Sequence, residues 1–291
     1  MSGGVTGFGS RLGAVFSGPG HLCVGIDPHP YLLSEWGITD DAAGVREFGL
    51  RVVDAMVGRS AIAKPQVAFF ERHGSAGFAS LESVFAAARD AGILVIADAK
   101  RGDIGTTVEA YAEAWLTPGS PLEADAMTVS AFQGVGSLAA PRELAVATGK
   151  GLFVLAATSN PESIDAQQAV LKSGPFAGRS VAAGIVDEVH EWNSREADGH
   201  SGSLGSVGVV LGATLTLSDY GISDDRLGST PILAPGFGSQ GARLEDLRAL
   251  YGAASANVIV SASRSVLGAG ADGIARSIDD QRLALEKAFA A

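Results

Sequence analysis

A cluster of charged residues in the segment IADAKRGDIGTT, residues 96–107, has the clearest capacity for chemistry in this sequence. Asp98, Lys100, Arg101 and Asp103 follow an apolar run directly. An ammonium group flanked by carboxylates can stabilise a developing negative charge and can donate a proton. A charged run is usually a solvated surface, but this one begins where a buried strand is predicted to end.

The spacing within this cluster indicates a shared site. Asp98 and Lys100 are two residues apart, so on a strand their side chains point to the same side. Lys64 lies inside the preceding predicted strand and can join them. Alternating signs make buried charges tolerable, and one interpretation is an ion-pair network that only connects strands. Because such pairs are a poor source of stability, we favour a functional site.

Eight short apolar segments must position these residues. They are evenly spaced and apolar on both faces, which is typical of parallel strands covered by helices; they span 22–26, 61–66, 93–99, 126–130, 151–158, 206–212, 231–235 and 256–263. Amphipathic helical patterns lie between them, at 44–58, 78–92, 180–192 and 241–252. This alternation predicts a (β/α)₈ TIM barrel, with a doubly wound open sheet as the alternative.

The domain organisation is predicted to be simple. The 291 residues suit one barrel, because α/β barrels commonly reach this length as a single domain. We expect a single domain over 1–291, with a short N-terminal extension at about 1–20 and a surface loop at about 193–206.

Composition limits the partners of the protein. A net charge of -11 disfavours binding to nucleic acid or to an anionic membrane, although one local arginine can still bind a phosphate. The single cysteine, Cys23, excludes an internal disulfide. Neither a membrane-spanning run of about 18 apolar residues nor a signal peptide is apparent. We therefore expect a cytoplasmic enzyme.

A barrel of this kind carries its reactive groups at the carboxyl ends of its strands. Polar residues predicted there are Asp27, Lys64, Asp98, Lys100, Ser159, Gln240 and Arg264. The last two belong to the glycine-rich segment APGFGSQGAR and to VSASRSVLGAG, after the seventh and eighth strands, where such barrels bind phosphate. A plain turn and a surface arginine are the alternative. A Mg²⁺ site at Asp27 and Asp98 stays open, although two nearby lysines disfavour a cation.

These residues resemble the orotidine 5′-phosphate decarboxylase family. DAKRGDIGTT matches the signature D-x-K-x-x-D-I-x-x-T, and the agreement with the longer bacterial, mycobacterial-type branch is close. The resemblance covers nearly the whole chain, through CVGIDP, Lys64, SNP, APGFGSQG and SASRS in matching order. One departure is the pair Arg101-Gly102, where other branches carry bulkier residues.

The resemblance implies a role for each matching residue. Lys64, Asp98, Lys100 and Asp103 correspond to a catalytic Lys-Asp-Lys-Asp array. The implied substrate contacts are Asp27 and Thr107 at the ribose, Ile104 and Ser159 at the pyrimidine, and Gln240 and Arg264 at the phosphate. The resemblance also implies a homodimer in which Asp103, with Ile104 and Thr107, enters the site of the neighbouring subunit.

The implied reaction is the decarboxylation of orotidine 5′-monophosphate to UMP and CO₂ in pyrimidine biosynthesis, with no cofactor and no metal. Lys100 would protonate the carbanion left at C6. Two alternatives remain. One is a Mg²⁺-dependent sugar-phosphate decarboxylase or aldolase of the same superfamily, which EDTA would inhibit. The other is a non-catalytic barrel that binds a phosphorylated ligand.

Overall fold

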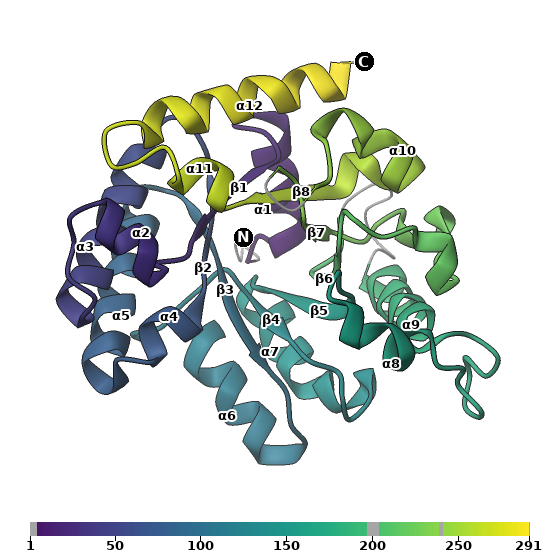
Figure 1. Cartoon of the computed structure of the whole chain (residues 1–291). Helices are drawn as coiled ribbons and strands as arrows, with labels where there is room; N and C mark the ends of the chain where they lie inside the picture. Colours follow the sequence, from purple (N-terminus) through teal and green to yellow (C-terminus); the bar gives the residue numbers. More distant parts are fainter. Residues whose placement is uncertain (1–4, 197–203, 239–240, 291) are drawn as a thin grey trace.

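Eight parallel strands form a closed barrel in the computed structural model, which describes residues 5–196, 204–238 and 241–290 (Figure 1). Each strand pairs with the next along the chain, and β1 also pairs with β8. This closure confirms the predicted (β/α)₈ barrel and excludes an open sheet. The strands are β1 (Leu22–Ile26), β2 (Ile62–Pro65), β3 (Leu94–Arg101), β4 (Ala126–Val129), β5 (Gly151–Ala157), β6 (Val207–Leu211), β7 (Ile232–Pro235) and β8 (Val258–Ala262).

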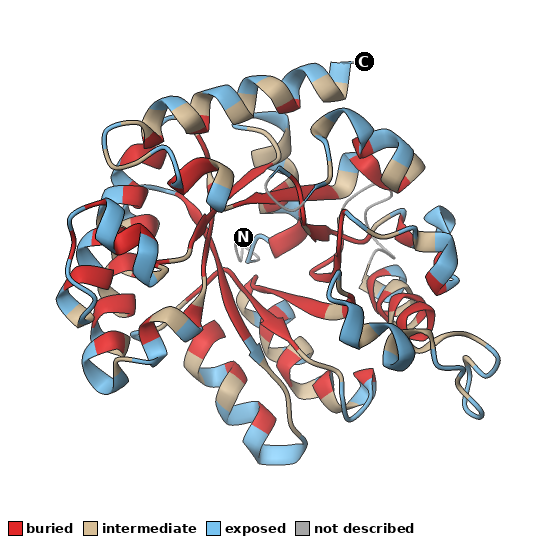
Figure 2. Cartoon of the chain, in the orientation of Figure 1, coloured by how far each residue is buried: buried red, intermediate tan, exposed pale blue. Residues whose placement is uncertain are grey.

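Helices surround the barrel, with buried inner faces and exposed outer faces (Figure 2). After β6 the described residues form two 3-10 turns, Leu217–Tyr220 and Asp224–Leu227, in place of an α-helix. The α-helices are α1 (Phe8–Ser17), α2 (Pro30–Glu35), α3 (Ala42–Met56), α4 (Val67–Glu71), α5 (Gly74–Asp90), α6 (Gly105–Leu116), α7 (Ala139–Thr148), α8 (Ile164–Gln168), α9 (Val181–Glu196), α10 (Leu247–Tyr251), α11 (Arg264–Leu267) and α12 (Ile274–Ala290). Across the described residues, we find no helix with the length and apolar character needed to cross a membrane.

Most predicted helices differ from the structure by a few residues at their ends, such as α5, which begins at Gly74 rather than at 78. Two predicted segments differ for reasons that their contacts or backbone geometry explain. The helix expected over 241–252 is a 3-10 turn, Leu244–Asp246, followed by the short α10; Gly241, with φ +112°, has a backbone conformation outside the helical range. The loop expected at about 193–206 starts later, because α9 continues to Glu196. The buried Asn193 explains this extension, since its side-chain amide exchanges hydrogen bonds with the backbone of Val207 on β6. The rest of that predicted loop, 197–203, lies outside the described residues.

The side chains inside the barrel change from apolar to polar along the strands. Because alternate residues of a strand share a face, Ile62 and Lys64 of β2 both point inward, as do Ile96 and Asp98 of β3. The apolar members form one buried cluster inside the barrel: Cys23, Ile62, Leu94, Ile96, Ala126, Phe153, Val210, Leu233 and Ile259. The charged members therefore lie above an apolar floor, toward the carboxyl ends of the strands.

Helix α1 closes the opposite, amino-terminal end of the barrel (Figure 1). Phe8 is fully buried and meets the ring of Phe153 edge-on, with 5.9 Å between the ring centroids. Leu12, one turn further on, belongs to the same apolar cluster. Gly151 leaves the space for this helix, because a Cβ atom at that position would lie 2.5 Å from the Phe8 ring. The helix thus completes the barrel core from outside the sheet.

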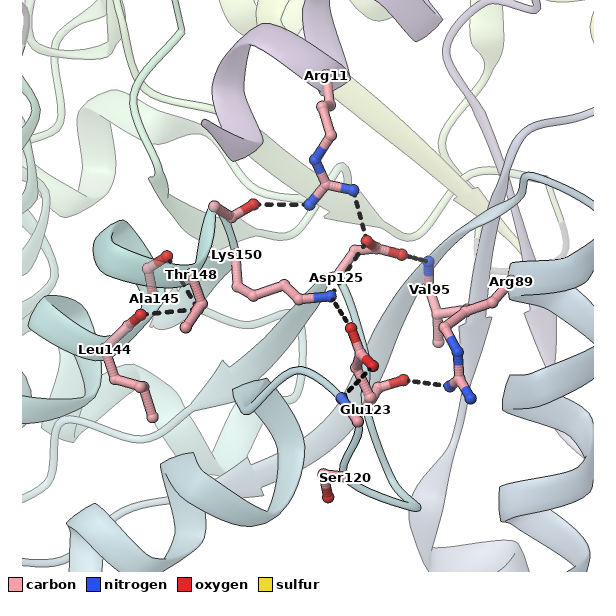
Figure 3. A network of polar contacts seen from close by, with 12 residues as sticks. Arg11, Arg89, Val95, Ser120, Glu123, Asp125, Leu144, Ala145, Thr148 and Lys150 are labelled. Atoms are coloured by element: carbon pink, nitrogen blue, oxygen red, sulfur yellow. Dashed lines mark hydrogen bonds and ion pairs between the residues drawn. The ribbon is translucent and has the colours of Figure 1, made fainter. Parts of the chain in front are cut away.

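A network of charged groups fixes α1 to this end of the barrel (Figure 3). The Arg11 guanidinium donates to the Asp125 carboxylate at 2.5 Å and to the Gly149 carbonyl at 2.7 Å. Asp125 also accepts a hydrogen bond from the Val95 amide. The Lys150 ammonium forms ion pairs with Asp125 and with the Glu123 carboxylate, which precedes β4 on the same loop. Since these buried charges have opposite partners, the network orients α1 across the barrel end.

We predict that Leu12→Ala lowers the free energy of unfolding by about 2–5 kcal/mol, because it leaves a cavity in the barrel floor. Leu283→Ala is the matched control, since Leu283 also lies on a helix but is 45% exposed; its effect should stay within about 0.5 kcal/mol. Equilibrium denaturation with urea measures both. Equal effects of the two substitutions would contradict the role of α1 as part of the core.

Candidate active site

A cavity of about 620 Å³ opens at the carboxyl ends of the strands. Its floor is apolar, and its walls carry polar side chains from several strands and from the loops that follow them. The predicted site residues that line it are Asp27, Lys64, Asp98, Lys100, Ser159 and Arg264. Ser159 and Arg264, which follow β5 and β8, are exposed at its rim. The barrel thus brings together residues up to 237 positions apart along the chain.

The Asp98 carboxylate is the centre of the polar contacts in this cavity. Its Oδ2 atom accepts a hydrogen bond from Lys64 Nζ at 3.0 Å and another from Gln66 Nε2 at 2.9 Å. Its Oδ1 atom accepts from Lys100 Nζ at 2.6 Å and from the Thr128 hydroxyl at 2.9 Å. Each carboxylate oxygen therefore has one ammonium donor and one neutral donor.

Charge compensation keeps this cluster ionised. Burial alone would raise the pKa of the Asp98 carboxyl, but the ammonium groups of Lys64 and Lys100 outweigh it and hold that pKa well below its ordinary range. Burial alone would lower the pKa of Lys64, but the carboxylates of Asp98 and Asp27 outweigh it and raise that pKa. Asp98 and Lys64 are consequently both charged at neutral pH.

The backbone at Lys100 departs from regular strand geometry. Lys100 has φ +48° and is alone among the described non-glycine residues in having a positive φ. This left-handed conformation costs a residue with a Cβ atom roughly 1–2 kcal/mol. The pairing of β3 with β4 shifts register between Ala97 and Arg101. Lys100 and Asp98 meet as predicted, but strand alternation alone does not explain their contact.

The three predicted site residues that follow Lys100 in the chain lie outside the cavity. Asp103, Ile104 and Thr107 are not among the residues that line the cavity, and the Asp103 carboxylate accepts the amide of Ile104 at 2.9 Å. The Ile104 side chain is 62% exposed. Gly102 permits this path, because a Cβ atom there would lie 2.2 Å from the Ser130 carbonyl oxygen. Within one chain, the predicted array is therefore incomplete.

Two buried polar atoms at the ends of β1 and β8 have no hydrogen-bond partner in the described part of the chain: Asp27 Oδ1 and Ser263 Oγ. The strand ends that carry them approach closely, since a Cβ atom at Gly25 would lie 2.7 Å from Ser263 Cβ. Both residues line the cavity, so these atoms can meet polar groups of a ligand. Gln240, predicted for the phosphate end, lies outside the described residues.

Sequence reasoning missed Gln66, Thr128 and Ser263. The signal was present: Gln66 is two residues after Lys64, and inward-facing side chains on a strand recur every second residue. Thr128 is two residues after Ala126 of the barrel floor, and Ser263 is four after Ile259. Extending each inward row to the end of the predicted segments, 61–66, 126–130 and 256–263, would have found all three.

We predict that Asp98→Asn lowers the free energy of unfolding by about 3–5 kcal/mol at pH 7, because it leaves the buried Lys64 ammonium without its carboxylate. Asp272→Asn, on an exposed loop residue, is the matched control and should change it by about 0.5 kcal/mol or less. Denaturant titration followed by circular dichroism compares the two. A stability of Asp98→Asn equal to that of the control would refute the buried charge pair.

Comparison with known proteins gives matches over most of the chain. The sequence model of the orotidine 5′-phosphate decarboxylase / HUMPS family matches residues 20–276. The chain is 49% identical to the orotidine 5′-phosphate decarboxylase of Salinispora tropica, over 95% of this chain and 96% of the relative. The same enzyme of Streptomyces coelicolor is also 49% identical, over 96% of each chain.

Solved structures share the whole fold. A protein from Streptomyces avermitilis superposes with a TM-score of 0.91 at 47% identity, over 99% of this chain and 98% of that one. The OMP decarboxylase of Leishmania donovani gives a TM-score of 0.76 at 28% identity, over 98% of this chain and 100% of its own. The match extends over nearly the whole sequence and over the barrel, and the chain belongs to the orotidine 5′-phosphate decarboxylase family.

Proposed function

We propose that this enzyme decarboxylates orotidine 5′-monophosphate to UMP and CO₂ and that Lys100 is the proton donor. The observation that carries this proposal is the Lys100 ammonium, 2.6 Å from the Asp98 carboxylate at the wall of the cavity. The Lys100 side chain is 46% exposed, so its ammonium is open to a bound substrate. Family membership supports the substrate and the reaction.

The chemistry explains why a fixed ammonium is needed. Loss of CO₂ from C6 of the pyrimidine leaves an electron pair in the ring plane, where no adjacent carbonyl acts as a simple electron sink. A preorganised cation at that carbon stabilises the developing charge. The same ammonium then transfers its proton to C6, so that one residue serves both steps. Lys100 suits this role, and no step of it calls for a cofactor.

Asp98 and Lys64 hold the proton donor in place under this proposal. The Asp98 carboxylate attracts both ammonium groups and lies beside the position of the departing CO₂. Lys64 is 7% exposed and is bound through its own contact with Asp98 Oδ2. These contacts hold the charged groups at fixed positions, and fixed charges are what electrostatic catalysis requires.

The rest of the substrate would occupy the remaining wall. We assign the ribose to Asp27, whose buried Oδ1 atom lacks a partner in the described chain, and the pyrimidine edge to Ser159. We assign the phosphate to Arg264, at the start of α11, and to Gln240. Binding energy from the phosphate, far from C6, can hold the ring against Lys100 and so increase turnover.

A homodimer would complete the site. Asp103, Ile104 and Thr107 are absent from the lining of their own cavity, and Ile104 exposes an apolar side chain. Phe132, in the loop after the neighbouring strand β4, is 92% exposed. Two exposed apolar side chains on adjacent loops suit a two-fold interface. Across it, Asp103 would reach the Lys100 of the second copy, Ile104 its pyrimidine pocket and Thr107 its ribose.

The alternative of a Mg²⁺-dependent sugar-phosphate enzyme is less well supported. Both oxygens of Asp98 already accept two protein donors each, and an ammonium is one of each pair. This donor set suits a carboxylate that orients lysines rather than one that binds a cation. We further propose that the whole chain, 1–291, acts as one cytoplasmic barrel domain. Both α1, which precedes the first strand, and α12, which follows the last, contribute buried side chains to the core of the barrel, and this supports the single domain.

We predict that Lys100→Ala lowers kcat by about 10⁴-fold or more, because it removes both the cation and the proton donor. The fall in ultraviolet absorbance as orotidine 5′-monophosphate is consumed gives the rate. Lys287→Ala, at an exposed position on α12, is the control and should keep the wild-type rate. Substantial turnover by Lys100→Ala, or EDTA inhibition of the wild type, would overturn the assignment.

A mixing experiment tests the shared site. Lys100→Ala and Asp103→Ala homodimers should each be nearly inactive. After dissociation and reassociation, half of the dimers are mixed, and each mixed dimer has one site with both native residues. We therefore expect about one quarter of the wild-type specific activity to return. If no activity returned although mass spectrometry detected mixed dimers, Asp103 would not act across the interface.

A further inference from the structure

One hydroxyl group, that of Thr128 at the carboxyl end of β4, contacts both the backbone of Lys100 and the carboxylate of Asp98. We propose that Thr128 is a positioning residue that fixes the Lys100 ammonium in its reactive place. This inference rests on the proposed role of Lys100 as the proton donor. Thr128 itself acts through Lys100 and Asp98, because its one polar side-chain atom is already bound to them.

The contacts of Thr128 use its hydroxyl in two directions. The oxygen accepts the Lys100 backbone amide at 3.0 Å, and its proton is donated to Asp98 Oδ1 at 2.9 Å. Thr128 is 1% exposed, so water does not compete for these bonds. A hydroxyl has one proton and two lone pairs, and this geometry engages the proton and one lone pair.

The amide that Thr128 accepts belongs to the strained residue. Lys100 has φ +48°, a conformation that persists only where the surroundings enforce it. The β3–β4 ladder is interrupted between Ala97 and Arg101. Within that interruption the Thr128 hydroxyl accepts the Lys100 N–H group. It therefore supplies the hydrogen bond that stabilises the left-handed backbone.

These contacts form a closed ring around Lys100. Its backbone amide binds Thr128, Thr128 binds Asp98 Oδ1, and the same oxygen accepts the Lys100 ammonium at 2.6 Å. The backbone amide of Lys100, through Thr128, and its side-chain ammonium, directly, are thereby both connected to the same carboxylate oxygen. Gln66 differs, because it donates to Asp98 Oδ2 alone and has no contact with Lys100 in the hydrogen-bond network of the described residues.

Loss of the hydroxyl would free the backbone of Lys100 to relax toward an ordinary conformation. The ammonium would then shift relative to C6, and a displacement of about 1 Å can reduce a rate by roughly 100-fold. Substrate binding depends on other groups, since the phosphate and ribose are assigned to the loops after β1, β7 and β8 and to Thr107 of the second copy. We therefore expect a defect in kcat with little change in KM.

The experiment compares Thr128→Val, which replaces the hydroxyl with a methyl group of similar size, with Thr128→Ser, which keeps the hydroxyl. Thr230→Val is the matched control: Thr230 is fully buried and its hydroxyl accepts the Asn193 side-chain amide, but it lies just before β7, at the far end of the barrel. Steady-state kinetics give kcat and KM. Hydrogen–deuterium exchange of a peptide covering 98–102 reports on the Lys100 amide.

For Thr128→Val we expect kcat to fall roughly 10- to 100-fold, with KM within about threefold of the wild type, and faster exchange in the 98–102 peptide. Thr128→Ser should keep most of the wild-type kcat and the slow exchange. Thr230→Val should keep kcat even where its unfolding midpoint falls. If Thr128→Val does not fold, Thr128→Ala against Thr128→Ser makes the same comparison of the hydroxyl.

Three results would overturn the inference: wild-type kcat in the variant without the hydroxyl, an equal loss in Thr128→Ser, or a loss that appears in KM alone. Each is measured against an active wild-type enzyme. An inactive wild type would instead contradict the proposed function, so the two failures are distinguishable.

Discussion

The site depends on the compensation of one buried charge, the Asp98 carboxylate. A single negative charge that is 8% exposed cannot be left unpaired, because desolvation would cost more than the fold can supply. Two ammonium groups and two neutral donors compensate it. The same contacts keep Lys64 charged and hold the side chains of Lys64 and Lys100 at fixed positions. Charge compensation and the fixed geometry of the two lysines are therefore one arrangement in this protein.

The barrel makes this arrangement possible by dividing its interior into two levels. Inward side chains are apolar at the amino-terminal side, where Phe8 of α1 packs against Phe153. Two residues further along the strands, the same inward rows carry Lys64, Asp98 and Thr128. The apolar floor excludes water from beneath the charges and lowers the local dielectric constant. Each contact to Asp98 is consequently stronger than it would be on the surface.

Much of this could be predicted from sequence, because burial on both faces leaves a continuous apolar signal for each strand. The strand segments, the barrel and the meeting of Lys64 with Asp98 follow from that signal and from strand alternation. The conformation of Lys100 does not, since its positive φ arises from contacts with β4, more than 25 positions away along the chain. Similarly, α9 is longer than its amphipathic pattern because Asn193 binds the backbone of β6, a tertiary contact that a local pattern does not contain.

The pair Arg101-Gly102 separates Lys100, which lines the cavity, from Asp103, which does not. Arg101 donates to the Ala99 carbonyl at 2.9 Å and to Glu71 at 2.8 Å, which fixes the end of β3 to α4. Gly102 then lies against the Ser130 carbonyl with no space for a side chain.

The chain therefore leaves the barrel directly after Lys100, and the Asp103 carboxylate binds the amide that follows it rather than Lys100. A bulkier residue in place of Gly102 would have to move this loop away from β4. The small residue thus allows a short turn in which Lys100 faces its own cavity while Asp103 faces outward. In this chain, the separation of Asp103 from the cluster of Lys64, Asp98 and Lys100 follows from the space available beside one carbonyl oxygen.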